Sequence, residues 1–238
     1  MKILSYRMTY DSGFAPNPFG GILTLATCTP NHKRARLEVG DWIIGIEADD
    51  LRKRRKEKLC PEKDNLVIYV AKVDEILTLN EYFHDERFQM KKFVEDEGWE
   101  RRRGDNVYYI EDGMWKWIRG HEHDGNECKF FPIQSANKSG CKLIDKDIEG
   151  NKVFICKEFS YFGDKCVEFD KQFASCIIEK QGIKYCKEDN PKYKEFLTYI
   201  QKLMSKYGKG KIGNPILCTI GERKCIEKET NLSSCAKN

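Results

Sequence analysis

Residues 5–21 read SYRMTYDSGFAPNPFGG, and this segment decides how the rest of the chain is interpreted. It holds four aromatic rings, one Arg, one Asp, two Pro and three Gly. Residues 2–8 have the pattern of a strand, but Pro16 and Pro18 prevent a regular continuation because each fixes its own φ and restricts the residue before it. Rings and polar side chains on a stiff loop suit a pocket for a flat ligand. The alternative is a proline-rich loop that closes a barrel, with its rings in the core.

The composition indicates a globular protein whose surface is only weakly basic. The chain has 238 residues, of which 40% are hydrophobic and 34% charged, and this is enough to bury a core. The formal net charge is +4, so any contact with nucleic acid must come from local basic patches. No apolar stretch is long enough to span a membrane, and the first twenty residues lack the apolar region of a signal peptide. We therefore expect a cytoplasmic protein without a membrane partner.

The eleven cysteines indicate neither disulfides nor a metal site. Their number is odd, no C-x-x-C spacing occurs, and disulfide frameworks belong to secreted domains. Four of them recur every ten residues between 156 and 186, and we interpret them as small buried or strand residues. The one metal-like cluster is HEHD at residues 121–124 with Cys128 nearby, and its spacing is unlike that of paired zinc ligands. We interpret it as a solvated turn and expect no metal.

Short strands and long charged connections occupy most of the chain. Runs of β-branched and aromatic residues between turn signals predict strands at residues 22–28, 39–46, 66–76, 107–110, 114–118 and 153–163. A hairpin turn is expected at residues 111–113, between two of these strands. The highly charged residues 47–64 are interpreted as an exposed arm or a short helix.

Two helices complete the expected elements. Thr78 or Asn80 is expected to cap a short helix. A longer helix has an apolar stripe over residues 193–207, with Pro191 at its first position and Gly208 after its end. Many short strands with few helices predict an α+β fold built around a curled sheet or a small β-barrel.

The sequence lacks the motifs of the common enzyme classes. No G-x-S-x-G, H-E-x-x-H, G-x-G-x-x-G or protein-kinase signature occurs, and no cofactor is expected. Asp11 and Asp105 lie beside aromatic strands, where either could act as a general acid or base. Both are also common turn residues. The residues therefore favour a binding module over an enzyme.

Several segments resemble the nucleotide modification associated domain 2 family, over about residues 1–215. They are residues 5–11, 13–18, 21–28, 39–45, 69–83, 104–109 and 159–163, in the same order as in that family. The resemblance implies an association with DNA base modification, notably in phage and bacterial systems. By fold analogy, residues 40–46 also resemble PUA, ASCH and EVE domains, which bind modified bases or RNA in a ring-lined pocket. This implies a PUA-like curled sheet or small β-barrel with flanking helices, as a single domain over residues 1–220 with a tail at 221–238.

Residues and resemblance together favour a module that binds a modified or unmodified base in an aromatic pocket, within nucleic acid or as a free nucleotide. The residues expected to contact the ligand are Ser5, Tyr6, Arg7, Asp11, Phe14, Asn17, Asp41, Trp42 and Tyr108. Those expected to follow phosphates are Lys33, Arg34, Arg36, Arg52, Arg54, Arg55, Arg101, Arg102 and Arg103.

Two other functions stay open. One is an enzyme that acts on a nucleotide or a modified base, with Asp11 or Asp105 as its general base. The other is a protein that sequesters a small nucleotide signal, as a component of phage or host defence. Turnover would distinguish the first, and tight binding of a free nucleotide without binding of a polymer would distinguish the second.

Overall fold

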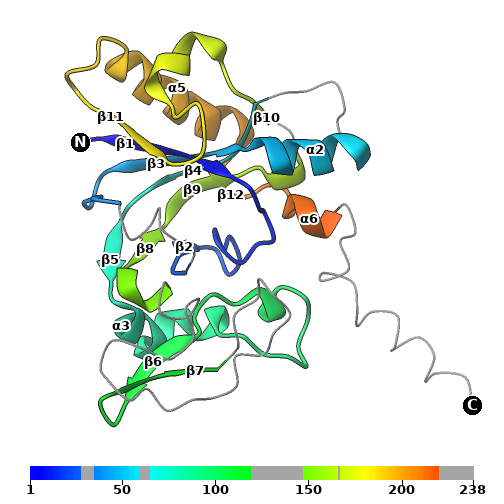
Figure 1. The fold of residues 1–238 in the computed structure, drawn as a ribbon, viewed down its shortest axis with the longest axis vertical. Coiled ribbons are helices and arrows are strands. Elements are labelled where there is room, and N and C mark those ends of the chain that lie inside the picture. The colour runs from blue at the N-terminus through cyan, green and yellow to red at the C-terminus, as the bar shows by residue number, and fades with distance from the viewer. Residues whose placement is uncertain (28–34, 59–64, 119–146, 166, 220–238) are drawn as a thin grey trace, which may run out of the picture. The chain divides into compact units, whose positions relative to one another are not determined.

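The structure is a computed structural model that describes residues 1–27, 35–58, 65–118, 147–165 and 167–219 (Figure 1). Four of the sequence-based predictions concern residues outside these ranges. They are the phosphate contacts of Lys33 and Arg34, the interpretation of residues 121–124 with Cys128, that of Cys166, and the tail at 221–238.

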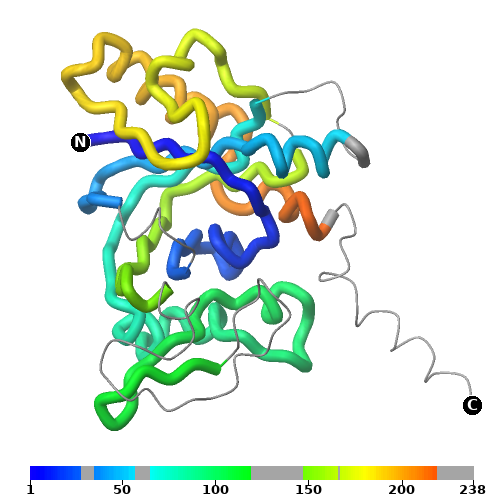
Figure 2. Tube along the Cα trace, viewed as in Figure 1, coloured from blue at the N-terminus to red at the C-terminus, as the bar shows by residue number. Residues whose placement is uncertain are grey.

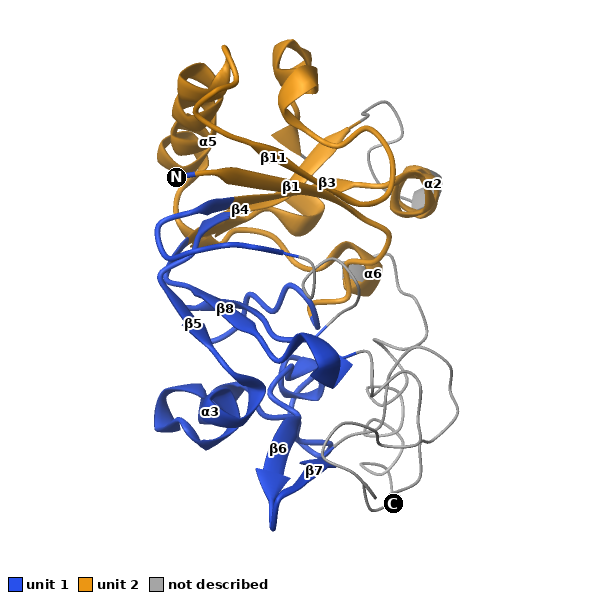
Figure 3. Ribbon diagram, turned by 60° about the vertical axis from the view of Figure 1, so that its left-hand side comes forward, with its two compact units in different colours: residues 1, 14–42, 71–158 blue, residues 2–13, 43–70, 159–238 orange. Residues whose placement is uncertain are grey.

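The chain forms two compact units, coloured separately in Figure 3. The first unit comprises residues 1, 14–42 and 71–158, and the second comprises residues 2–13, 43–70 and 159–238. Each unit is therefore assembled from segments that are far apart in the sequence, as the tube in Figure 2 traces. The expected single domain over residues 1–220 stays a prediction.

The largest sheet has seven strands. In order across the sheet they are β11 (Ile183–Cys186), β1 (Ile3–Met8), β3 (Trp42–Glu47), β4 (Leu66–Lys72), β9 (Glu158–Tyr161) and β12 (Gly210–Lys211), and β10 (Val167–Glu168) also pairs with β4. β1 and β11 are antiparallel, whereas β9 and β12 are parallel. Within the described residues this path has two ends, so the sheet is open and not closed into a barrel. The predicted α+β class with a multistranded sheet is confirmed.

The centre of this sheet is packed tightly enough to require a glycine. A Cβ atom on Gly45 of β3 would lie 2.4 Å from the ring atom Cε1 of Tyr69 and 2.8 Å from the sulfur of Met8. Atoms at such distances overlap, so only glycine fits between β1 and β4 without a shift of its neighbours. The Tyr69 ring in turn brings its hydroxyl to 2.7 Å from the hydroxyl of Tyr6.

Helices cover the sheet of the second unit on both faces. α5 (Tyr193–Tyr207) packs its predicted apolar stripe against one face, and α6 (Ile216–Thr219) lies on the other (Figure 1). α2 (Asp49–Lys58) follows β3 and confirms the helical interpretation of the charged segment over these residues. Two short 3-10 helices, η3 (Gly163–Lys165) and η4 (Lys171–Cys176), complete the unit.

The start of α5 differs from its prediction, whereas its end agrees. The helix begins at Tyr193 with Lys192 at its N-cap, so Pro191 is not its first residue. The reason is a turn before the helix, in which the side chain of Asn190 accepts a hydrogen bond from the Lys192 N–H at 2.9 Å. At the other end, Gly208 has a φ of +92°, and its N–H donates to the carbonyl of Met204. Glycine adopts such a φ without strain.

The first unit contains a three-stranded sheet of β2 (Leu23–Leu25), β8 (Val153–Cys156) and β5 (Glu75–Leu77), and a hairpin of β6 (Tyr108–Glu111) and β7 (Met114–Trp117). Asp112 and Gly113 both have positive φ, as a two-residue hairpin turn requires, which confirms the predicted hairpin. α3 (Leu79–His84) begins with a capping box between Thr78 and Glu81, so Thr78 is the cap. The 3-10 helices η1 (Glu86–Lys91) and η2 (Arg101–Arg103) follow.

Two predicted strands are each divided in the structure. Residues 153–163 form β8 and β9, and residues 66–76 form β4 and β5, with the partners of each pair in different sheets. Asp74 fixes both divisions. Its carboxylate accepts hydrogen bonds from the N–H groups of Lys157 and Glu158 at 2.6 and 3.2 Å, and its own N–H donates to the carbonyl of Ile155. These bonds hold the chain between the strands in place of ladder pairing.

The cysteines that the structure describes agree with their interpretation as small buried residues. Cys156, Cys176 and Cys186 are buried free thiols, and Cys218 is half-buried. Burial raises the pKa of the Cys156 thiol well above its ordinary value. Within the described residues, no helix is both long and apolar enough to cross a membrane.

Candidate functional site

Ser5 and Tyr6 of the opening strand have buried side chains. The Ser5 hydroxyl accepts a hydrogen bond from the Ile178 N–H at 2.9 Å and donates to the Lys184 carbonyl at 3.3 Å. Tyr6 is paired with Tyr69, as described above. Both side chains therefore hold elements of the second unit together, and their contact with a ligand stays a prediction.

Asp11 is fully buried and connects the opening segment to two later ones. One carboxylate oxygen accepts a hydrogen bond from the Tyr161 hydroxyl, and the other accepts from the Ile216 N–H at 2.9 Å. The Asp11 carbonyl also accepts from the Leu217 N–H. Burial raises the pKa of Asp11 to about 6, although the two hydrogen bonds to its carboxylate oppose the shift.

Asn17 lies at the centre of a buried polar cluster in the first unit. Its side-chain N–H₂ donates to the Arg103 carbonyl at 2.8 Å, and its side-chain oxygen accepts from the Lys91 ammonium at 2.8 Å. Lys91 donates its other hydrogens to the carbonyls of Asn17 and Ile22 at 3.0 and 2.5 Å. Burial lowers the pKa of Lys91 to about 8, opposed by the nearby Asp105 carboxylate. All three donors of this ammonium are therefore used inside the unit.

Asp105 belongs to the same unit and is also fully buried. Its two oxygens accept hydrogen bonds from the hydroxyls of Thr24 and Tyr82 at 2.7 and 2.8 Å. Burial raises the pKa of Asp105, while the positive charge of Lys91 opposes the rise. The two candidate general bases, Asp11 and Asp105, thus lie in different units, and each is hydrogen-bonded to its own neighbours.

The other predicted ligand contacts also belong to the first unit. Asp41 accepts a hydrogen bond from a backbone N–H three residues earlier, at 2.8 Å. Trp42 is buried where β3 begins, and Phe14 is half-buried. The Tyr108 hydroxyl donates to Asp147 at 2.8 Å. Each unit therefore contains a part of the predicted pocket, and the aromatic pocket itself stays a prediction.

The arginines expected to follow phosphates are divided between the units as well. Arg36 and Arg101–Arg103 belong to the first unit, and Arg52, Arg54 and Arg55 lie on α2 in the second. Arg55 stands apart because its side chain is fully buried, with Nε and Nη2 at 2.8 and 3.1 Å from the two carboxylate oxygens of Glu47. Arg103 is likewise buried, whereas Arg36 is exposed.

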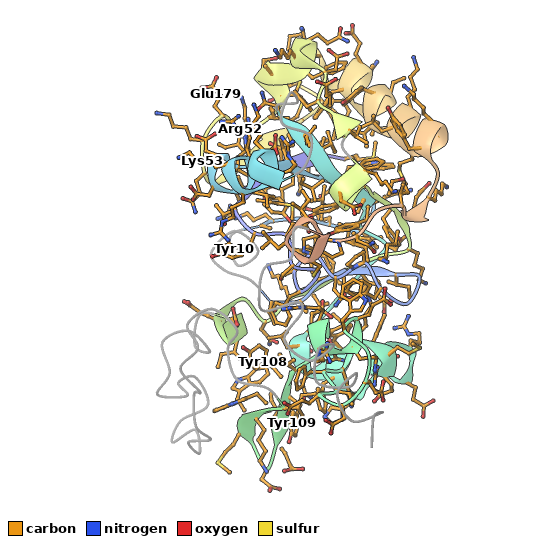
Figure 4. All side chains as sticks on the ribbon, turned by 90° about the vertical axis from the view of Figure 1, so that its right-hand side faces the viewer. Tyr10, Arg52, Lys53, Tyr108, Tyr109 and Glu179 are labelled. Atoms are coloured by element: carbon orange, nitrogen blue, oxygen red, sulfur yellow. The ribbon has the colours of Figure 1, made fainter. Side chains whose placement is uncertain are left out.

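A groove with a volume of about 370 Å³ lies beside Arg7 in the second unit. The chain around it comes from the end of β1, the start of α2, Asn65 and residues 179–181. Figure 4 shows two of its lining residues, Arg52 and Glu179, on the same side of this unit. The volume lies within the range of small-molecule sites.

The guanidinium of Arg7 is held in a fixed orientation at this groove. Nε donates to the Ile178 carbonyl at 3.0 Å, and Nη1 donates to the Glu47 carbonyl and the Asn65 side chain at 3.1 and 3.3 Å. Among the described residues, none accepts a hydrogen bond from Nη2 of Arg7. Burial and the positive charge of Arg52 lower the pKa of Arg7, which still leaves an arginine charged at neutral pH.

Asn65 has an unusual backbone conformation at this site. Its φ is +51°, in the left-handed region that asparagine tolerates better than most residues. Its carbonyl accepts a hydrogen bond from the Phe169 N–H, and its side chain accepts from Arg7. Asn65 therefore fixes the orientation of Arg7 from the strand β4 side of the groove.

The groove presents charges of both signs. Arg7, Arg52 and Lys180 supply positive charge, while Asp50 and Glu179 supply negative charge. Asp49 forms an ion pair with Arg52, and the Glu47 carboxylate is neutralised by the buried Arg55. Such a lining suits a ligand that carries both hydrogen-bond acceptors and donors, and it suits a simple polyanion less well.

Comparison with known proteins assigns the chain to a family. The model of nucleotide modification associated domain 2 matches residues 1–221, which is most of the chain. The chain belongs to this family. The resemblance inferred from the sequence is thereby confirmed, and the family description associates the protein with nucleotide modification. No curated protein and no solved structure matches the chain.

In this member of the nucleotide modification associated domain 2 family, the groove contains residues that the sequence did not identify as site residues. Arg7 and Arg52 are expected site residues, but Thr9, Asn65 and Lys180 are not. Asn65 follows a charged segment and Lys180 lies in a connection, so neither occurs within a recognisable motif. Only the folding of β1, β4 and the segment after η4 brings these residues together.

In the described part of this family member, no group of three or more His, Cys, Asp or Glu side chains is placed to hold a metal ion.

Proposed function

We propose that this member of the nucleotide modification associated domain 2 family binds a nucleotide in the groove beside Arg7. The observation that carries the proposal is the Arg7 guanidinium, which lines the groove and is held in place by three hydrogen bonds from Nε and Nη1. An oriented guanidinium fork suits a phosphate or the edge of a base. The orientation exists before the ligand arrives, so little side-chain entropy is lost on binding.

The mixed charge of the lining supports a nucleotide over an inorganic anion. A nucleotide offers phosphate oxygens to Arg7 and Lys180, and it offers sugar hydroxyls and base N–H groups to Asp50 and Glu179. Sulfate has no hydrogen-bond donor to offer the two carboxylates, and hydrogen phosphate offers fewer donors than a nucleotide does. A modified base would carry its additional group into the same groove, in keeping with the family description.

Calorimetric titration with a panel of modified and unmodified nucleoside monophosphates tests the proposal. Arg7→Met should weaken binding roughly ten- to hundredfold, because a hydrogen bond to a charged group contributes about 1.5 to 3 kcal/mol. Lys180→Met, at an exposed position, should weaken binding while leaving the fold unchanged. The matched control is Lys202→Met, which removes one exposed positive charge on α5 and should have no effect.

The same titrations discriminate between the functions considered above. A folded protein that binds no nucleotide, or whose affinity is the same in the Arg7 and Lys180 variants, contradicts the proposal. Chemical change of the bound nucleotide would favour an enzyme, and Asp11→Asn and Asp105→Asn would then identify its base. The base-binding pocket of PUA-like domains stays a separate prediction.

A further inference from the structure

An exposed aromatic residue directly follows a groove-lining residue in the chain. Thr9 lines the groove, and Tyr10, the next residue, is 45% exposed. Tyr10 contacts Arg54 of α2, and Asp50 and Arg52 of the same helix line the groove. Figure 4 shows Tyr10 on the same side of the second unit as Glu179, Arg52 and Lys53.

Tyr10 is held in position by the neighbouring helix. The guanidinium carbon of Arg54 lies 4.6 Å from the centre of the Tyr10 ring, and Nη2 of Arg54 donates to the Tyr10 hydroxyl at 3.1 Å. A cation over one face and a hydrogen bond at the hydroxyl both limit the rotation of the ring. An exposed ring that is fixed in this way is a ready platform for a second planar group.

α2, which contacts Tyr10 through Arg54, carries more positive charge than is required to bind the phosphate of one nucleotide. α2 has six basic and three acidic residues over Asp49–Lys58. One basic residue, Arg55, is buried in its pair with Glu47, but Lys53 is exposed and Arg54 is partly exposed. Charges that extend beyond the groove fit a ligand with several phosphates in a row.

We propose that the nucleotide in the groove is part of a single-stranded nucleic acid, and that the base of an adjoining nucleotide stacks on Tyr10. This inference rests on the proposed nucleotide site at Arg7 and extends it along the surface of α2. Arg52 contacts the strand at the groove, while Arg54 both supports the ring and faces the phosphates beside it. Stacking on an aromatic ring is open to every base, so Tyr10 contributes affinity and the groove contributes specificity. A duplex keeps its bases stacked on one another and does not offer them to Tyr10.

Fluorescence anisotropy with labelled single-stranded DNA and RNA oligonucleotides, and with a duplex of the same sequence, tests this proposal. The single strand should bind more tightly than a mononucleotide and with a steeper dependence on salt, because more phosphates are contacted. Tyr10→Ala should weaken binding of the single strand roughly tenfold and leave mononucleotide binding unchanged. Tyr10→Phe keeps the ring and should stay close to wild type, whereas Tyr10→Leu keeps an apolar group without a ring and should behave as Tyr10→Ala.

The outcomes separate this inference from the proposed function. If mononucleotides bind through Arg7 but the single strand binds no more tightly, or binds equally well in Tyr10→Ala, then the inference is overturned and the nucleotide site remains. If the duplex binds as tightly as the single strand, stacking on Tyr10 is also overturned. If mononucleotides fail to bind at all, the proposed function itself fails. Equal losses in Tyr10→Leu and Tyr10→Ala, with melting temperatures at the wild-type value, support the stacking role.

Discussion

Asp11 combines full burial with a carboxylate that titrates in the folded protein at a pH of about 6. An ordinary aspartate titrates near 3.8, so the folded protein binds this proton more tightly than the unfolded chain does. The stabilisation from the protonated group is therefore complete below about pH 4 and is lost as the pH rises to about 6. The size of the effect is on the order of 3 kcal/mol.

We expect Asp11→Asn to remove this pH dependence. The amide is neutral at every pH, so the difference in free energy of unfolding between wild type and variant should fall as the pH rises from 4 to 6. Urea denaturation at several pH values measures it. Tyr161→Phe removes a hydrogen bond that lowers the pKa of Asp11. In this variant the decrease in the free energy of unfolding should therefore occur at higher pH. A variant and a wild type with parallel pH profiles would contradict the assignment.

The polar residues of the opening segment show what sequence reasoning can and cannot predict at the scale of a residue. The stiff loop and the polar character of Asn17 were visible in the sequence. That the side chain of Asn17 binds Lys91 and the Arg103 carbonyl depends on partners more than seventy residues away. A polar side chain has the same sequence signature whether it contacts a ligand or buried backbone. Arg7 shows both cases at once, because it binds three internal acceptors and also lines the groove.

At the scale of an element, α2 is a charged helix that is anchored by two buried residues. Leu51 and Arg55 are four positions apart, so they lie on the same face of the helix, and both are fully buried. Arg55 is paired with Glu47, whose carboxylate also accepts a hydrogen bond from the Leu66 N–H at 3.1 Å. The rest of the helix is polar, so the ion pair between Arg55 and Glu47 decides whether α2 stays packed against the second unit.

Arg55→Met should therefore destabilise the protein far more than the loss of another positive charge on the same helix. Removal of one partner leaves the buried Glu47 carboxylate without its counter-ion, and we expect a loss of about 3 to 5 kcal/mol in the free energy of unfolding. The matched control is Lys53→Met, an exposed position, where the change should stay within about 0.5 kcal/mol. Urea denaturation of both variants measures the difference. Equal effects would mean that the Arg55 pair is not an anchor.

Elements with strong local signals were predicted well, and their boundaries were predicted less well. The stripe of α5, the Thr78 cap and the hairpin at Asp112-Gly113 depend on neighbouring residues, and all three are present. The divisions after β4 and β8 depend on hydrogen bonds between Asp74 and a segment eighty residues later, so residue preferences could not reveal them. The same limit applies to α2, where a buried Arg55 looks like any other basic residue in the run.

At the scale of the whole molecule, the chain passes repeatedly between its two units. Apart from Met1, the passages fall after residues 13, 42, 70 and 158. Three of them occur inside strands of the seven-stranded sheet, namely β3, β4 and β9. β3 and β9 each have one end residue in the first unit, and β4 has two. This connectivity favours a single cooperative transition for the described part of the chain.

The four tryptophans allow a direct test, because Trp42, Trp99, Trp115 and Trp117 all belong to the first unit. Arg55 lies in the second unit, so Arg55→Met places the destabilisation where no tryptophan reports it directly. If the units unfold together, the variant should shift the transition seen by tryptophan fluorescence and that seen by far-ultraviolet circular dichroism to the same lower urea concentration. Wild type should also show coincident transitions by both probes. A fluorescence transition that keeps its wild-type midpoint in Arg55→Met, while the dichroism transition moves, would show that the two units unfold independently and that the expected single domain over residues 1–220 consists of two.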